Sequence, residues 1–77
     1  MNVPQICEEI KNIIDALWAG EIDEKEAAEK INTILAVKEN RVKIFRDRGE
    51  KSPTFERLVG KKRIKTFDFL LALDTNN

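Results

Sequence analysis

The sequence predicts an all-α fold, a small helical bundle, from three observations. Apolar residues recur at spacings of three and four through most of the chain, which is the period of one helix face. Glycine and proline together make up only five of the 77 residues, and each falls at the edge of an apolar stretch. Asp23 and Ser52, which favour the N-terminal cap of a helix, stand before two of these stretches. A chain of this length is expected to form a single domain, residues 1–77, with a small core.

The first helix is predicted over residues 4–19. Pro4 suits a first turn because the missing N–H of proline costs nothing there, and Gly20 suits the left-handed conformation that ends many helices. One face of this helix is apolar and is expected to pack into the core. This face holds Val3, Ile6, Cys7, Ile10, Ile13, Ile14, Leu17 and Trp18.

The second helix is predicted over residues 24–46, and it forms an N-terminal helical hairpin with the first. Asp23 and Glu26 are a pair typical of a capping box at its start. Its apolar face comprises Ala27, Ala28, Ile31, Ile34, Leu35, Val42 and Phe45. Asn40 interrupts this pattern, and residues 42–45 fit an extended segment as well as a helix. The sequence therefore leaves the conformation of residues 38–48 open.

Two more helices complete the predicted bundle. Ser52 as N-cap and Pro53 at the first position predict a short helix over residues 53–59, which Gly60 ends. Its apolar side holds Phe55, Leu58 and Val59. A C-terminal helix is predicted over residues 61–73, with an apolar face of Ile64, Phe67, Leu70, Leu71 and Leu73. Residues 74–77 are expected to be a frayed tail.

The composition argues against an enzyme and against a bound metal or cofactor. The chain has no histidine and no tyrosine, so the commonest general base is missing. Its one cysteine, Cys7, lies on the apolar face and is expected to be a small buried hydrophobe rather than a nucleophile. The carboxylates of Glu21, Asp23, Glu24 and Glu26 lack the spacing of a calcium loop and fit a helix-capping cluster instead.

The expected location is the cytoplasm, with no membrane contact. No apolar window approaches the roughly 20 residues that span a bilayer, and the N-terminal residues lack the pattern of a signal peptide. A lone cysteine also fits a reducing compartment.

Charge is divided unevenly along the chain although the formal net charge is zero. Residues 1–36 carry eight acids and three bases, a net −5, whereas residues 37–77 carry eleven bases and six acids, a net +5. The densest basic segment is Lys61, Lys62, Arg63 and Lys65, at the start of the predicted last helix. Bases there oppose the helix dipole, so we expect an acidic group that offsets the cost.

Three acidic groups fit this basic segment. They are the acids of the first half of the chain (Glu24, Glu26 and Glu29), an acidic surface of another protein, and the phosphates of a nucleic acid. The two helices around Gly60 are similar to a helix-turn-helix, whose second helix enters the major groove. However, no Asn or Gln stands beside the bases to read adenine, and the pI of about 6.3 is low for a DNA-binding domain. Pairing within the chain or with a protein is therefore favoured over nucleic acid.

Trp18 and Phe45 are the candidate apolar anchors of a binding surface, although each also fits the core. Small neighbours leave little bulk to cover Trp18, and Phe45 flanks the polar loop of residues 46–53 near several arginines. Tryptophan is enriched at interface hot spots. The predicted partner-binding residues are therefore Lys61, Lys62, Arg63, Lys65, Trp18 and Phe45. A symmetric dimer through Ile6, Ile10, Ile13 and Leu17 is the further alternative.

Three segments form a recognisable pattern: residues 16–22, 31–35 and 58–64. The first contains Trp-Ala-Gly-Glu-Ile, and the last contains Leu-Val-Gly-Lys-Lys-Arg. With these segments the chain resembles a family of short uncharacterised proteins of Gram-positive bacteria and their phages, which have Trp-x-Gly-Glu-Ile and Leu-Gly-Lys-Lys-Arg segments. Val59 is an insertion relative to the second motif. The resemblance covers most of the chain and implies no activity or site residues. It implies a small phage-associated protein that binds a host protein.

We therefore expect a small regulator or inhibitor, not an enzyme, that occludes a surface of another protein. Its basic half would steer it to an acidic patch of that partner. The alternative is a nucleic-acid-binding regulator that uses the helix beginning at Lys61. A second alternative is a self-associating structural module, that is, a homo-oligomer.

Overall fold

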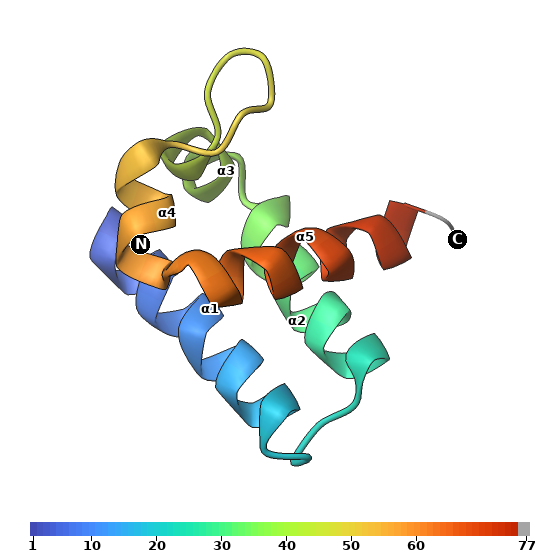
Figure 1. The fold of residues 1–77 in the computed structure, drawn as a ribbon. Helices are drawn as coiled ribbons and strands as arrows, with labels where there is room; N and C mark the ends of the chain where they lie inside the picture. Colours follow the sequence, from blue (N-terminus) through green and yellow to red (C-terminus); the bar gives the residue numbers. More distant parts are fainter. Residues whose placement is uncertain (76–77) are drawn as a thin grey trace.

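Five α-helices make up the part of the chain that the computed structural model describes, which is the backbone of residues 1–75 and the side chains of residues 1–73. The helices are α1 (Val3–Trp18), α2 (Glu24–Ala36), α3 (Lys38–Ile44), α4 (Pro53–Val59) and α5 (Lys61–Thr75). α1 and α2 form the predicted hairpin, and α5 crosses both, while α3 and α4 lie at the end opposite the α1–α2 turn (Figure 1). The prediction of a small all-α helical bundle is confirmed.

The helix starts are fixed by local capping. Asp23 and Ser52 each accept a hydrogen bond from the backbone N–H three residues later, at 2.8 and 3.1 Å, as predicted. Asn2 makes a third cap that the sequence pattern did not reveal, because it exchanges two hydrogen bonds with Gln5, at 2.8 and 2.9 Å. α1 therefore begins at Val3, one residue before its predicted start. These bonds satisfy N–H groups that the first turn of a helix leaves unpaired.

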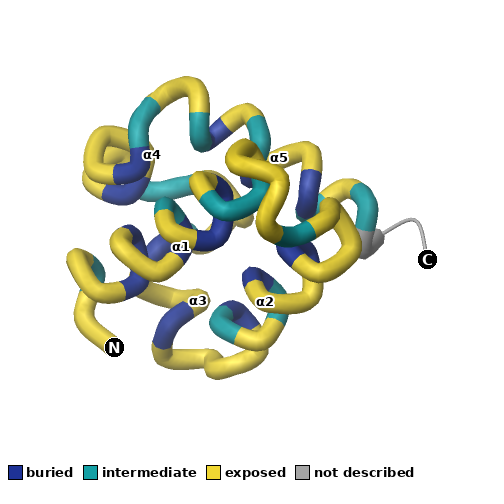
Figure 2. Tube along the Cα trace, turned by 90° about the horizontal axis from the view of Figure 1, so that it is seen from below, coloured by how far each residue is buried: buried dark blue, intermediate teal, exposed yellow. Residues whose placement is uncertain are grey.

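The core lies where α5 crosses α1 and α2, and Figure 2 shows the buried positions gathered on the inner sides of the helices. Phe67 is fully buried, with its ring edge-on to Phe55 at 5.2 Å between centroids and stacked with Phe45 at 6.2 Å. Burial also raises the pKa of the Cys7 thiol above its usual range. The buried apolar set is Ile6, Cys7, Ile10, Ile13, Ile14, Ala27, Ala28, Ile31, Leu35, Ile44, Phe55, Val59, Ile64, Phe67 and Leu70.

The predicted single helix over residues 24–46 is wrong, because the chain breaks at Val37 into α2 and α3. Val37 is extended, with φ −79° and ψ 113°. The Asn40 side chain donates to the Ile34 carbonyl at 3.0 Å, and this carbonyl also accepts a longer hydrogen bond of 3.4 Å from the Val37 N–H at the end of α2. An unbroken helix would be about 35 Å long, whereas the longest extent of the whole chain is 32 Å. The bend returns Ile44 to the core, where it is fully buried.

A tight hairpin of residues 45–51 joins α3 to α4 and projects from one end of the molecule (Figure 1). Phe45 and Lys51 form an antiparallel bridge. Inside it, the Arg46 N–H donates to the Glu50 carbonyl at 2.7 Å, and the Gly49 N–H donates to the Arg46 carbonyl at 2.8 Å. Of the segment that the sequence left open, residues 38–44 are therefore helical and the rest forms this hairpin.

The C-terminal helix is longer than predicted. α5 runs to Thr75, so the predicted tail of residues 74–77 is wrong for residues 74 and 75, and residues 76–77 lie outside the described residues. The apolar run of residues 67–73 contains no glycine or proline that would end the helix. Gly60 alone separates α4 from α5. Its φ of +99° and ψ of 148° turn the chain sharply there, in a conformation that other residues rarely adopt.

Candidate protein-binding surface

Trp18 lies at the end of α1 and is 51% exposed, unlike the buried residues of the same helix face. Arg63 of α5 covers one side of its ring, with the guanidinium carbon 5.6 Å from the ring centroid. Asp15, one turn before Trp18, holds that guanidinium through two hydrogen bonds of 2.9 and 3.1 Å. We call these three residues the Trp18 cluster.

The ion pair in the Trp18 cluster joins residues 48 positions apart in the chain. Its hydrogen bonds lower the pKa of the Asp15 carboxyl below its usual range and raise that of the Arg63 guanidinium. A bidentate pair fixes the plane of the guanidinium, and the indole ring is attracted to that cation. The cation that covers one side of the exposed Trp18 ring is thus held in place by Asp15.

Lys61, Lys62 and Lys65 are exposed on the first turns of α5, beside Arg63. Among the side chains that the structure describes, no carboxylate lies within ion-pair distance of these three lysines. The alternative in which this segment pairs with the acidic first half of the chain therefore holds for Arg63 alone among the described side chains. Its partner is Asp15 of α1 and not one of the glutamates of α2. The three lysine charges remain available to an external acidic group.

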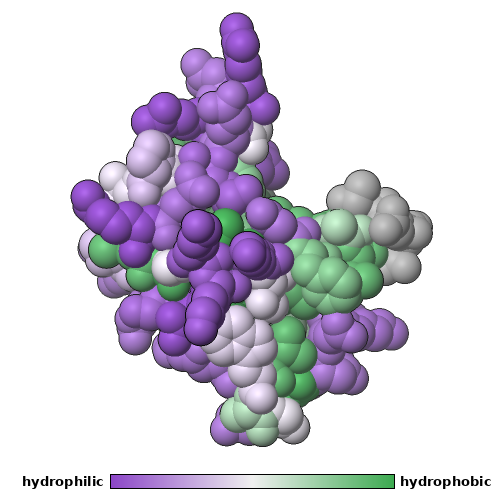
Figure 3. All heavy atoms as spheres, in the orientation of Figure 1, coloured by the Kyte–Doolittle hydropathy of each residue, from purple (hydrophilic) through white to green (hydrophobic). Residues whose placement is uncertain are grey.

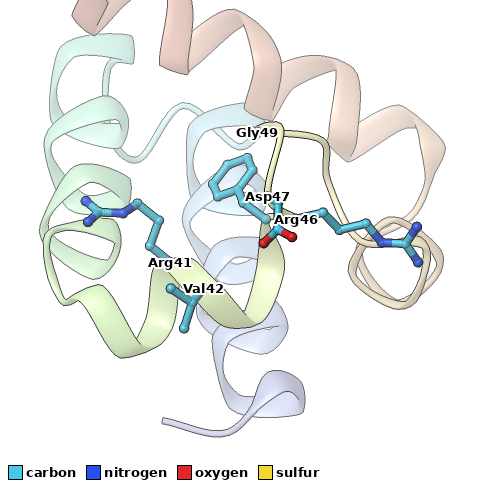
Figure 4. A pocket seen from close by; sticks show the side chains of 6 residues that line it. Arg41, Val42, Arg46, Asp47 and Gly49 are labelled. Atoms are coloured by element: carbon cyan, nitrogen blue, oxygen red, sulfur yellow. The ribbon is translucent and has the colours of Figure 1, made fainter.

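Phe45, the second predicted anchor, lies on a different surface. It is half-buried, and Figure 1 places the end of α3 far from the end of α1. Phe45 lines an open pocket between α3 and the hairpin, as Figure 4 shows. The Arg41 and Arg46 side chains point to opposite sides there, so their guanidinium groups do not converge on one ligand. The full lining is Arg41, Val42, Phe45, Arg46, Asp47 and Gly49.

Phe69 is an exposed aromatic residue that the sequence pattern did not single out, and it is 48% exposed. Every residue between Phe67 and Leu73 except Asp68 is apolar, so helical spacing alone does not say which side faces outward. The sequence does contain one sign of an exposed aromatic residue here, because this run has more apolar residues than one helix face can bury. Figure 3 shows the apolar surface over the C-terminal half of α5, with hydrophilic surface over its first turns.

The apolar face of α1 that the sequence offered for a symmetric dimer packs into the core of the same chain. Ile6 and Ile10 have no exposed surface, and Ile13 is 8% exposed. A second copy cannot reach this face in the folded protein, so that version of a homo-oligomer is wrong.

The described residues hold neither a candidate metal site nor a candidate membrane-spanning helix. No group of three or more acidic or cysteine side chains there is placed to hold a metal ion. Within the same part of the chain, no helix combines the length and apolarity needed to cross a bilayer.

The comparison with known proteins identifies a family but not an activity. A family model described as conserved hypothetical protein, CLB_0814_fam, matches residues 1–72. No curated protein and no solved structure matches the chain. The family match agrees with the resemblance to short uncharacterised proteins and spans nearly the whole sequence. The chain therefore belongs to the CLB_0814_fam family of conserved hypothetical proteins.

Proposed function

We propose that the protein is a small regulator that binds another protein through the Trp18 cluster together with Lys61, Lys62 and Lys65. One observation carries this proposal: an exposed tryptophan is held by a bidentate ion pair beside three unpaired lysines. Tryptophan dominates many interface hot spots, and an aromatic ring held in place loses little entropy on binding. The Asp15–Arg63 pair also joins α1 to α5, whereas the three lysines and the exposed face of Trp18 make no ion pair or core contact among the described residues.

The chemistry of this surface fits a partner with an acidic patch beside an apolar recess. The lysine charges would steer the encounter and raise the association rate, most strongly at low salt. The Trp18 ring would then supply desolvated contact area. The regulator acts by covering a surface that the partner needs for activity or assembly. We place it in the cytoplasm, and the resemblance to phage-associated proteins favours an inhibitor of a host protein.

The test is affinity capture from a nuclease-treated lysate of the host bacterium with three tagged proteins. These are the wild type, the Lys62→Glu/Lys65→Glu variant, and a Lys38→Glu/Arg48→Glu control that reverses two exposed, unpaired bases elsewhere. We expect the wild type and the control to retain one stoichiometric protein that the first variant loses. Equal capture by both variants refutes the electrostatic role of α5.

A second pair of variants tests the apolar anchor. Trp18→Ala removes the indole, and Val42→Ala removes a comparably exposed apolar side chain on α3. We expect the first to weaken capture at least tenfold, as loss of a hot spot does, and the second to leave it unchanged. Circular dichroism of both variants verifies that helicity is kept. Unchanged capture by Trp18→Ala contradicts the proposed site.

Nucleic acid is the second candidate partner, because α4, Gly60 and the basic start of α5 are arranged as a helix pair with a sharp turn. Two observations make nucleic acid a weaker candidate than a protein partner. Arg63 is already bound to Asp15, and α5 contains no Asn or Gln to read a base edge. Capture that disappears on nuclease treatment, with an affinity that falls steeply as salt rises, would reverse this order.

A further inference from the structure

Val42 and Phe45 leave apolar surface uncovered in the pocket between α3 and the hairpin. Val42 is 60% exposed and lies one turn before Phe45, whose half-buried ring stacks on Phe67 at 6.2 Å between centroids. The two residues line an open pocket of about 530 Å³ (Figure 4). Pockets of about 300–1,000 Å³ are typical of ligand sites. This pocket therefore has room for one large apolar side chain of a ligand.

The same pocket carries two arginines that no carboxylate neutralises. Arg41 lies on α3 and Arg46 begins the hairpin, and both are exposed. Over the described residues neither makes an ion pair, although Arg41 donates one long hydrogen bond of 3.5 Å to the Leu35 carbonyl. The surroundings are also basic, because residues 38–50 contain five bases and three acids. The pocket therefore attracts negative charge.

The directions of the two arginines limit the shape of a ligand that can use both. In Figure 4 the Arg41 and Arg46 side chains point to opposite sides of the pocket, so one small anion cannot bind both guanidinium groups. A chain that crosses the pocket can present a separate negative charge to each of them. In an extended peptide, the residues two positions before and after a given residue lie on the same side as that residue. An apolar residue with an acid at each of these positions fits the pocket.

Asp47 favours a peptide over a single-stranded nucleic acid. Its carboxylate also lines the pocket, and no ion pair of the described side chains involves it. A carboxylate repels the phosphates of a nucleic acid strand, but it accepts hydrogen bonds from the backbone N–H groups of a peptide. Val42 also offers aliphatic surface, whereas proteins that bind single strands stack the bases on aromatic rings.

We propose that this pocket binds an extended acidic segment of another protein, with the pattern acid–x–apolar–x–acid. The apolar side chain packs against Val42 and Phe45, and the two acids pair with Arg41 and Arg46. Asp47 accepts a hydrogen bond from the backbone of the segment. The site is separate from the Trp18 cluster and does not depend on the proposed function.

The test is a titration of the nitrogen-15-labelled protein, followed by NMR, with the end-blocked peptide Gly-Glu-Ser-Leu-Ser-Glu-Gly. The amide signals of residues 41–49 should shift and saturate. The isomer Glu-Glu-Ser-Leu-Ser-Gly-Gly has both acids on one side of leucine and reaches only one arginine, so it should bind about threefold more weakly. The peptide Gly-Lys-Ser-Leu-Ser-Lys-Gly should cause no saturable shift.

Protein variants locate the site. Arg46→Glu should weaken binding of the acidic peptide about tenfold, because it replaces an attraction with a repulsion. The matched control Arg48→Glu reverses the same charge two residues further along the hairpin, outside the pocket lining, and should have a much smaller effect. Val42→Asp should abolish the shifts, and Lys62→Glu/Lys65→Glu should bind like the wild type. All these positions are exposed, and circular dichroism verifies that helicity is kept.

Four results would overturn the proposal. They are no saturable shift with the acidic peptide, equal binding of the two isomers, equal effects of the two arginine variants, and tighter binding of a single-stranded oligonucleotide than of the peptide. Shifts confined to the first turns of α5 and lost in Lys62→Glu/Lys65→Glu would also overturn it, but would leave the proposed function standing. Peptide binding at the pocket by a protein that captures nothing through α5 would overturn the proposed function alone.

Discussion

Replacing Phe67 with alanine should remove a large part of the stability of this protein. Phe67 has no exposed surface and contacts the rings of Phe55 and Phe45, at 5.2 and 6.2 Å between centroids. A buried Phe→Ala change costs about 3–5 kcal/mol. A domain of 77 residues has a total free energy of unfolding of about 4–12 kcal/mol, at about 0.05–0.15 kcal/mol per residue. We therefore expect Phe67→Ala to lose at least about a quarter of the free energy of unfolding at 25 °C, and all of it if the wild type lies at the low end of this range.

Phe69 gives a matched control in the same helix, two residues away. It is 48% exposed, so Phe69→Ala should cost less than about 1 kcal/mol. The assay is urea denaturation followed by circular dichroism. The expected result is a large loss for Phe67→Ala and a small one for Phe69→Ala. Equal losses would refute the assignment of one residue to the core and the other to the surface.

Three other predictions concern a helix break, a turn and an ion pair. Asn40→Ala should lower the free energy of unfolding by about 1–3 kcal/mol, because the buried Asn40 side chain supplies the shorter of the two hydrogen bonds to the Ile34 carbonyl; a urea titration measures this. Gly60→Ala should cost about 1–3 kcal/mol, since a Cβ has room there but the positive φ is strained; a loss below 0.5 kcal/mol in thermal unfolding contradicts that. The lowered pKa of Asp15 means that its ion pair stabilises the fold above about pH 4 and that this contribution is lost as the pH falls further. Asp15→Asn should therefore be less stable than the wild type at pH 7, this difference should shrink as the pH falls below about 4, and emission from Trp18 should shift over the same acid range.

The elements that could be predicted from the sequence are those that local chemistry decides. Asp23 and Ser52 cap α2 and α4 because each acts on a backbone group three residues away. The break at Val37 could not be predicted in this way. No glycine or proline stands near it, and the reason for the bend is that Ile44 must return to a core formed by distant helices. Local preference permitted a longer helix, and tertiary packing decided against it.

The candidate site likewise combines features that the local sequence predicts with features that depend on how the helices pack. The basic character of residues 61–65 is a local property of the sequence, and the exposure of Lys61, Lys62 and Lys65 follows from it. The pairing of Arg63 with Asp15 joins residues 48 positions apart and depends on how α5 crosses α1. Trp18 continues the spacing of a buried helix face, yet it is the last residue of α1 and is 51% exposed, which helix periodicity does not reveal.

The position of α5 across the α1–α2 hairpin has a consequence for synthesis of the chain. α5 contributes Ile64, Phe67 and Leu70 to the core, and it packs against α1, α2 and α4. The ribosome makes these residues after the rest of the core. Until they emerge, α5 does not cover the apolar faces of α1 and α2, and these faces present a surface of the kind that chaperones bind. A chain that stops before residue 61 should therefore fail to fold and should be removed by proteolysis, so no shorter product can act in place of the full bundle.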